Sequence, residues 1–489
     1  MTLAASQATC NASPSVEDGD GSHLALHEDR ETKPGGRLWS RDFVGLVVTQ
    51  FLGALNDNMF RWLILPIGKD LVESRGVRPD LALSAGSVVF LLPFVLLAAP
   101  AGYLADRFSK RNVIVGCKLA EIGIMALGVA VMLTGNLYLM GAMLFLMGAQ
   151  SALFSPSKLG SIPELVRADR ISAANGMIAM TTMVAIILGG TAGGLLYTLT
   201  TPAGSRLGPG QSHWWISAAA LVGVAAAGWI ASLWIGPLRP ADPGRKPPRN
   251  PAAQTVRDLR SLGSRRPLLL AALAVAFFWS LGALCQINID KFAEFELLVA
   301  QKYVGPLLAV LVLGIGFGSM LAGIWSRGKI ELGIVPLGAA GIALGAMLLW
   351  IVPGAAGGPN GHAYGWTCLY LMILGTAAGL YEIPLQAFLQ ARSPAESRGS
   401  ILAATNFLCF SGMLLASVVF WLLAGVLGLS AREVFLVIGL VAVPACLTAV
   451  WLLPGATARV VLAPTLRLGR LYFGGSRRVC FLGETDAPP

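Results

Sequence analysis

The chain has 489 residues, of which 55% are hydrophobic and only 13% are charged. An ordinary soluble domain carries about 25% charged residues, so this composition argues against a soluble protein and favours a polytopic membrane protein. The net charge of +10 is spread in short blocks of Lys and Arg between apolar runs, which indicates membrane topology and no nucleic-acid partner. The seven cysteines have no metal-binding spacing, so we expect no metal and no cofactor.

The apolar runs predict an all-α protein with twelve transmembrane helices. A polar tail, residues 1–41, comes first and is expected to be disordered and cytoplasmic. A helix that crosses a bilayer needs roughly 20 mostly apolar residues. The stretches that meet this requirement are 42–66, 82–104, 112–133, 137–158, 173–199, 213–236, 268–289, 303–325, 333–352, 366–389, 399–426 and 431–453.

The segment 237–267 is rich in Pro and Arg and is predicted to be a cytoplasmic linker between two six-helix halves, 42–236 and 268–453. Most Lys and Arg residues lie in this linker, in the two tails and in the loops after even-numbered spans. The positive-inside rule therefore places both termini, including the tail 454–489, in the cytoplasm.

Short repeats favour a duplication of the two halves. The sequence Leu-Gly-Ala-Leu occurs at 52–55 in the first span and at 281–284 in the seventh, and Ala173-Ala174-Asn175 has a counterpart at 403–406. Each match is weak alone, but the two offsets agree within two residues. Halves that repeat in this way are typical of transporters whose substrate site lies between them near the bilayer midplane.

The loop between the second and third spans, Gly102-Tyr-Leu-Ala-Asp-Arg-Phe-Ser-Lys-Arg111, resembles the signature loop of the major facilitator superfamily, G-x-x-x-D-[RK]-x-x-[RK]-[RK]. It departs from the pattern only where Ser109 replaces the usual Gly. The resemblance implies a conformational latch that joins the halves on the cytoplasmic side while the substrate site faces out. Its residues would be Gly102, Asp106, Arg107, Lys110 and Arg111.

Four further stretches resemble the bacterial lysophospholipid transporters, a branch that includes proteins fused to a phospholipid acyltransferase: FLGALNDNMFRW (51–62), GAQSALFSPSKLGSIPELV (148–166), GKIELGIVPLG (328–338) and IPLQAFLQARSPAESRGSILAATNF (383–407). The resemblance implies a monomeric secondary transporter of the cell inner membrane. It would move lysophospholipids by alternating access among membrane lipids, for reacylation by a separate acyltransferase. None of the four histidines begins the acyltransferase signature His-x-x-x-x-Asp, so we expect no enzyme activity.

Charged residues inside the first and third spans are the strongest site candidates, because a charge at mid-membrane costs several kcal/mol unless it has a partner or water. Asp57 and Arg61 share one helical face with Gln50 and Ala54, so the four should face a cavity between the halves. Arg61 would bind a substrate phosphate. Asp57 would hold Arg61, release it on protonation or cation binding, or pair with an amine headgroup; the alternative is a pair that only neutralises itself.

Lys118 and Glu121 form a second predicted pair. Two interpretations stay open: the pair contacts the substrate, or the lysine snorkels to the membrane interface. Lys158 is a cavity candidate or an interfacial anchor. Gln286 and Asn288 could reach a phosphate or glycerol hydroxyl, or serve only as interhelical hydrogen-bonding groups. Glu382 lies outside the family pattern. The complete set of substrate or coupling candidates is Asn56, Asp57, Asn58, Arg61, Lys118, Glu121, Gln150, Lys158, Gln286, Asn288, Glu382 and Gln386.

Glycine pairs at 189 and 193 and at 314 and 318 predict close helix packing. Two other functions remain open at this point. One is a proton-coupled drug or small-solute exporter with Asp57 or Glu121 as the proton carrier. The other is a scaffold or receptor that does not transport, which the intact loop 102–111 and the intramembrane charges disfavour.

Overall fold

The computed structural model describes residues 38–73, 79–200, 214–300, 303–326, 328–353, 361–458 and 460. Residues 1–37 of the predicted N-terminal tail and 461–489 of the predicted C-terminal tail lie outside this range. All the described residues belong to one compact unit, Gly35–Pro489.

The described part of the chain is all-α, as predicted. Its α-helices are α1 (Arg41–Glu73), α2 (Pro79–Leu96), α3 (Ala98–Arg107), α4 (Lys110–Thr134), α5 (Leu137–Leu165), α6 (Ile171–Thr200), α7 (Trp214–Ser232), α8 (Pro251–Gly263), α9 (Arg266–Lys291), α10 (Val304–Trp325), α11 (Ile334–Trp350), α12 (His362–Arg392), α13 (Arg398–Phe420) and α14 (Ala431–Leu452). Short π-helical turns extend α9 through Phe292–Glu296 and α13 through Trp421–Val426.

Each predicted span overlaps a helix. Within the described ranges, nine helices are long and apolar enough to cross a membrane, and α2 with α3 forms a bent pair that would make a tenth. The other two predicted spans coincide with α1, which carries intramembrane charges, and with α11, which has only 17 residues.

Two features of the helices were not predicted. The second span is broken at Leu97, where α2 and α3 meet at an angle of 50° four residues after Pro93. The linker contains a helix, α8, that begins at Pro251, and the side chain of Asn250 caps it by accepting a hydrogen bond from the Ala253 amide at 3.1 Å. An Asn cap followed by Pro is a helix-start signal, so the sequence did contain evidence for α8.

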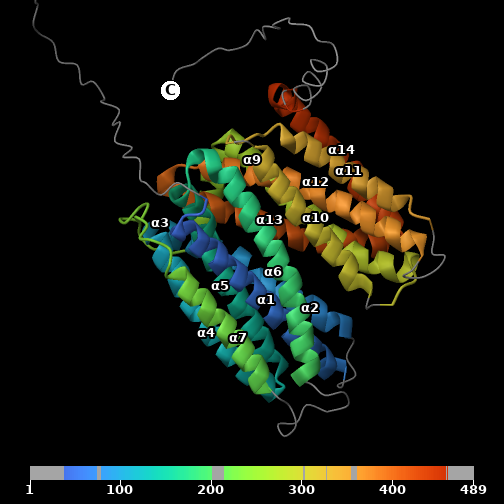
Figure 1. Cartoon of the computed structure of the whole chain (residues 1–489), viewed down its shortest axis with the longest axis horizontal. Coiled ribbons are helices and arrows are strands. Elements are labelled where there is room, and N and C mark those ends of the chain that lie inside the picture. The colour runs from blue at the N-terminus through green and yellow to red at the C-terminus, as the bar shows by residue number, and fades with distance from the viewer. Residues whose placement is uncertain are drawn as a thin grey trace, which may run out of the picture. The chain divides into compact units, whose positions relative to one another are not determined.

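Helices α1–α7, hereafter the N-terminal helices, pack with one another, and α9–α14, the C-terminal helices, do the same (Figure 1). Glycines permit the close approaches, as predicted. A Cβ on Gly189 would lie 2.4 Å from the Leu55 carbonyl oxygen of α1, and a Cβ on Gly318 would lie 2.0 Å from the Thr376 carbonyl oxygen of α12. These positions admit no side chain without a backbone shift.

The two sets of helices meet mainly where α13 packs on α2, α3 and α5 and where α10 packs on α6. Asn175 of α6 and Gln390 of α12 exchange two side-chain hydrogen bonds, of 2.8 and 2.9 Å, in a buried position. The rings of Phe94 in α2 and Phe410 in α13 stack with their centroids 3.8 Å apart. These contacts border the space between the N-terminal and C-terminal helices.

Candidate functional site

A cavity of about 360 Å³ lies between the N-terminal and C-terminal helices. Its walls come from α1, α2, α4, α5 and α6 on one side and from α9, α12 and α13 on the other. Eight of the predicted candidates line it: Asp57, Asn58, Arg61, Lys118, Gln150, Lys158, Glu382 and Gln386.

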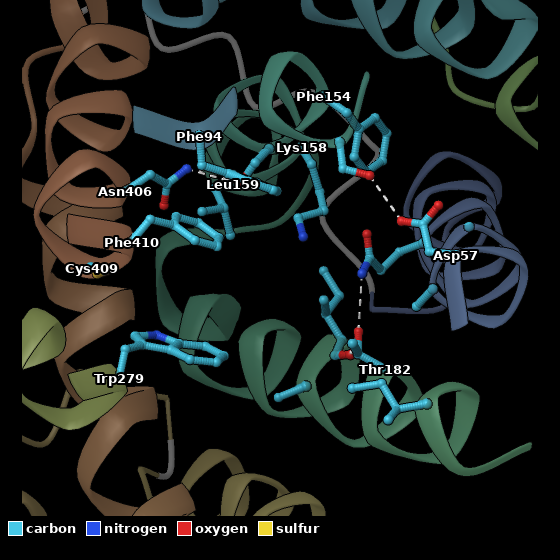
Figure 2. Close-up of a pocket in the computed structure, with 18 of the residues that line it drawn as sticks. Asp57, Phe94, Phe154, Lys158, Leu159, Thr182, Trp279, Asn406, Cys409 and Phe410 are labelled. Carbon is cyan, nitrogen blue, oxygen red and sulfur yellow. Dashed lines mark hydrogen bonds between the residues drawn. The ribbon is translucent and has the colours of Figure 1, made fainter. Parts of the chain in front are cut away.

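The polar face of α1 lies on the cavity wall, where its helical spacing places it. Gln50, Ala54, Asp57 and Arg61 all line the space. The Gln50 amide donates to the Thr182 hydroxyl of α6 at 3.2 Å, which fixes that end of the face (Figure 2). The i, i+4 pattern was therefore sufficient to place these four residues.

Asp57 and Arg61 are not paired directly in the described structure, contrary to the ion pair expected from their spacing. The Asp57 Oδ2 atom accepts a hydrogen bond from the Ser151 hydroxyl at 2.8 Å, and its Oδ1 atom is buried without a partner. The Arg61 guanidinium lies over the Phe90 ring, 4.9 Å from its centroid. Competing partners on α5 and α2 draw the two side chains apart, and helical spacing cannot reveal such partners.

Lys118 and Glu121 form the predicted ion pair, at 2.6 Å, with both side chains 2% exposed. Glu121 also accepts hydrogen bonds from Asn56 at 2.9 Å and from Gln150 at 3.4 Å. Lys118 is therefore held in the protein interior and does not snorkel to the interface. A Cβ on Gly53 would lie 2.1 Å from the Lys118 Nζ atom, so the absence of a side chain on α1 makes room for this cation.

Lys158 points its amine into the cavity (Figure 2). Its Nζ atom lies 5.8 Å from the centroid of the Phe154 ring, and it forms no ion pair within 4.0 Å among the residues that the structure describes. The C-terminal helices contribute Glu382 of α12 to the wall, and this residue is 9% exposed. Gln386, one turn further along α12, also faces the cavity.

Part of the cavity wall is apolar and aromatic. Figure 2 shows Phe94, Leu159, Phe410 and Trp279 on one side of the space, away from Asp57. Asn406 of α13 donates to the Ser155 hydroxyl of α5 at 2.9 Å above this wall. The cavity thus offers both charged groups and hydrocarbon contacts.

Four candidates lie elsewhere. Asn56 and Glu121 belong to the buried cluster behind the wall. Asn288 is fully buried and donates to the Ala431 carbonyl at 2.8 Å, and Gln286 is exposed on the outer side of α9. The last two do not line the cavity, so the hydrogen-bonding interpretation fits Asn288. The resemblance between the first and seventh spans did not extend to the direction of these side chains.

The predicted latch residue Asp106 connects the two sets of helices. Its fully buried carboxylate accepts hydrogen bonds from the Gly399 amide (2.7 Å), the Ser400 amide (3.0 Å) and the Ser400 hydroxyl (2.7 Å) at the N-terminus of α13. The positive end of the α13 dipole and these unpaired N–H groups favour an anion at this position. Gly102 makes the approach feasible, since a Cβ there would lie 2.9 Å from the Ser400 Cα atom.

The linker also takes part in the latch, which was not predicted. Arg245 forms an ion pair with Asp106 at 2.5 Å and lies 3.6 Å from Asp258 of α8. Arg107 donates to the Arg245 carbonyl oxygen at 2.5 Å, so its hydrogen bond is to the linker. Burial raises the pKa of the Asp258 carboxyl, and the Gln254 and Arg245 side chains oppose that increase.

The remaining latch residues bind within the N-terminal part of the chain. Lys110 forms a 2.6 Å ion pair with Glu164 of α5, and Arg398 of α13 approaches the same carboxylate at 3.8 Å. Arg111 donates to the Ile235 carbonyl oxygen at 2.7 Å. Glu164 therefore connects the loop 102–111 to the start of α13, a role that the sequence analysis missed.

The comparisons with known proteins agree with this architecture. The family model described as the Major Facilitator Superfamily matches residues 48–417. The chain is 27% identical to a lysophospholipid transporter, LplT, of Klebsiella pneumoniae over 396 residues, which is 78% of this chain and 88% of that protein. It is also 27% identical to an LplT of Cronobacter sakazakii over 382 residues, 76% of this chain and 86% of that protein.

Solved structures show the same fold. The transporter FucP in its outward conformation has a TM-score of 0.66 with 14% identity, covering 84% of this chain and 98% of FucP. An outward-facing bacterial homologue of ferroportin has a TM-score of 0.60 with 14% identity, covering 83% and 97%. The chain is a multi-pass inner-membrane transporter and not an enzyme, and it belongs to the major facilitator superfamily.

Proposed function

We propose that this protein moves lysophospholipids across the bacterial inner membrane by alternating access, so that a separate cytoplasmic acyltransferase can reacylate them. The proposal draws on the relatives named lysophospholipid transporters and on the amphiphilic lining of the cavity. Membrane lipids would surround a transporter that works as a monomer.

The observation that carries the proposal is a pair of cavity-lining cations without a carboxylate partner. Arg61 contacts a ring, and Lys158 forms no ion pair within the described ranges. Keeping an unpaired cation away from bulk water is costly, and a substrate phosphate would offset that cost. Arginine suits this role because its planar donor fork matches phosphate oxygens.

The aromatic wall supports the second part of the substrate. Phe94, Phe410 and Leu159 provide hydrocarbon contacts for a single acyl chain, whose burial is favourable at about 0.8 kcal/mol per methylene. A small polar solute would use the charged groups of the cavity but would leave this wall without a ligand.

The latch supports an alternating-access cycle. Asp106 holds the start of α13 against α3, and we propose that this contact closes one side of the cavity. If both termini are cytoplasmic, as the charge distribution predicts, this closed side is the cytoplasmic one and the substrate enters from the opposite side. Release into the cytoplasm then requires the latch to open.

A proton-coupled exporter is the alternative, and one observation favours it. The buried Asp57 Oδ1 atom has no hydrogen-bond partner among the described residues, so it is a suitable acceptor for a transported proton. Glu121 is a poorer carrier, because Lys118, Asn56 and Gln150 already bind it. A neighbouring gene for an acyltransferase would favour the lysophospholipid proposal over this alternative.

The test compares Arg61→Ala with Arg167→Ala as a control for the loss of one arginine. Arg167 lies outside the cavity with 73% of its side chain exposed. Charged hydrogen bonds are worth roughly 1.5–3 kcal/mol, so uptake of labelled lysophospholipid into spheroplasts should fall about 10- to 100-fold in Arg61→Ala. Arg167→Ala should take up lipid at the wild-type rate. Wild-type uptake by Arg61→Ala, at equal amounts of membrane-inserted protein, would contradict phosphate binding at this position.

A further inference from the structure

The charges that line the cavity are divided unequally between the two sets of helices. The N-terminal helices contribute Asp57, Arg61, Lys118 and Lys158 to the lining. Among the described residues of the C-terminal helices, Glu382 is the one charged side chain on the wall. A substrate that contacts Glu382 and the cations at once would therefore bridge the two sets.

The charges that remain for a substrate are two cations and two carboxylates. Lys118 is already neutralised by Glu121 at 2.6 Å. The cations that remain are Arg61 and Lys158, and the carboxylates that remain are Asp57 and Glu382. Since no two of these four lie within ion-pair distance in the described structure, their charges remain available to a substrate.

The two carboxylates differ in their surroundings. Asp57 precedes Arg61 by one turn on the same face of α1, and Ser151 binds one of its oxygens. Arg61 lies only one helical turn away, and its positive charge disfavours a headgroup ammonium beside Asp57. Glu382 comes from α12 on the wall formed by the C-terminal helices, as does Trp279 of α9, whereas Lys158 comes from α5 on the wall formed by the N-terminal helices. It is the carboxylate that a positive group on the far end of a headgroup could reach.

Building on the proposed function, we propose that Glu382 selects the headgroup by accepting the primary ammonium of a zwitterionic lysophospholipid whose phosphate lies against Lys158 and Arg61. The ammonium of such a headgroup provides a counter-charge for Glu382, and the phosphate provides one for the two cations. A headgroup without a cation leaves the buried Glu382 carboxylate without a counter-charge. The bound phosphate then also repels this carboxylate. Both terms favour the zwitterion, because opposite charges in a poorly hydrated cavity interact more strongly than in water.

The experiment compares uptake of two labelled lysophospholipids, one with an ethanolamine headgroup and one with an uncharged glycerol headgroup, by the wild type and Glu382→Gln. The substitution keeps the shape of the side chain but removes its charge. A lost charged hydrogen bond corresponds to about a tenfold or larger decrease for the ethanolamine lipid. Uptake of the glycerol lipid should stay equal or rise, which also shows that the variant is folded. Glu294→Gln is the matched control: it makes the same substitution on a residue outside the cavity with 57% of its side chain exposed, and it should leave both uptake rates unchanged.

A measurement on the wild type tests the same inference without any substitution. Unlabelled ethanolamine lysophospholipid should compete with labelled uptake at least about tenfold more effectively than its N-acetylated form, which has no cationic amine. Equal competition by the two lipids overturns the proposal.

The outcomes separate this inference from the proposed function. If Glu382→Gln lowers uptake of both lipids equally, Glu382 acts in folding or coupling and the headgroup assignment is wrong. If both uptake rates are unchanged, the assignment is wrong while lysophospholipid transport stands. If the wild type takes up neither lipid, the proposed function fails and this inference fails with it.

Discussion

Replacing Asp106 with asparagine should open the latch without changing the cavity. The carboxylate accepts three hydrogen bonds from Gly399 and Ser400 and pairs with Arg245. Asparagine keeps the size of the side chain but offers one acceptor oxygen and no charge. Charged hydrogen bonds are worth roughly 1.5–3 kcal/mol and neutral ones roughly 0.5–1.5 kcal/mol, so the latched state should lose roughly 3 kcal/mol in total.

A loss of that size changes the ratio of latched to open molecules about a hundredfold. Hydrogen–deuterium exchange measures it directly, because the Gly399 and Ser400 amides are protected by the bonds in question. Exchange of the peptide that begins at Arg398 should accelerate in Asp106→Asn. Asp42→Asn is the matched control: Asp42 accepts the Gly236 amide at 3.0 Å in a similar carboxylate–backbone bond that does not involve α13.

Equal protection of the Gly399 and Ser400 amides in Asp106→Asn and the wild type would show that Asp106 does not hold the start of α13. Equal acceleration of exchange at the start of α13 in Asp42→Asn would show general destabilisation instead of a local effect. Substrate affinity measured in the latched state should not differ between the two variants.

Two further predictions concern the packing of the helices. Gly318→Ala should lower the thermal stability of the purified protein and its yield, because the new Cβ would lie 2.0 Å from the Thr376 carbonyl oxygen. In the control Gly282→Ala the new Cβ meets no atom within 4 Å, so this variant should be neutral. Equal melting temperatures of the two variants would contradict this prediction. For the Asn175–Gln390 pair, each single alanine variant removes both side-chain hydrogen bonds from the remaining buried amide and should cost roughly 1–3 kcal/mol. The double variant should cost less than the sum of the two in a double-mutant cycle, and strict additivity would show that the amides are not coupled.

The positions of the helices could be predicted closely from the sequence, because a bilayer imposes both the length and the apolar character of each span. The sixth span was predicted at 213–236 and α7 is observed at Trp214–Ser232; the tenth was predicted at 366–389 and α12 at His362–Arg392. The break at Leu97 was not predicted, because a proline alone does not show whether a helix will bend. Helix α8 was not predicted, because a charged, Pro-rich segment was expected to be irregular.

The site was predictable to the extent that it depends on one helix. The face of α1 with Gln50, Asp57 and Arg61 follows from a spacing of 3.6 residues per turn. Partners that come from distant segments were not predictable: Ser151 on α5 for Asp57, and Arg245 in the linker for Asp106. A single sequence gives the periodicity of each helix but not which helix lies opposite.

The position of Arg245 changes what the segment between the two sets of helices does. A passive tether only limits how far the bodies that it joins can separate. Here the tether places a guanidinium on a buried carboxylate that also binds the start of α13, so this segment contributes to the contact between the two sets of helices. If the proposed cycle operates, a factor that bound the tether and withdrew this arginine would weaken that contact without touching the binding chamber.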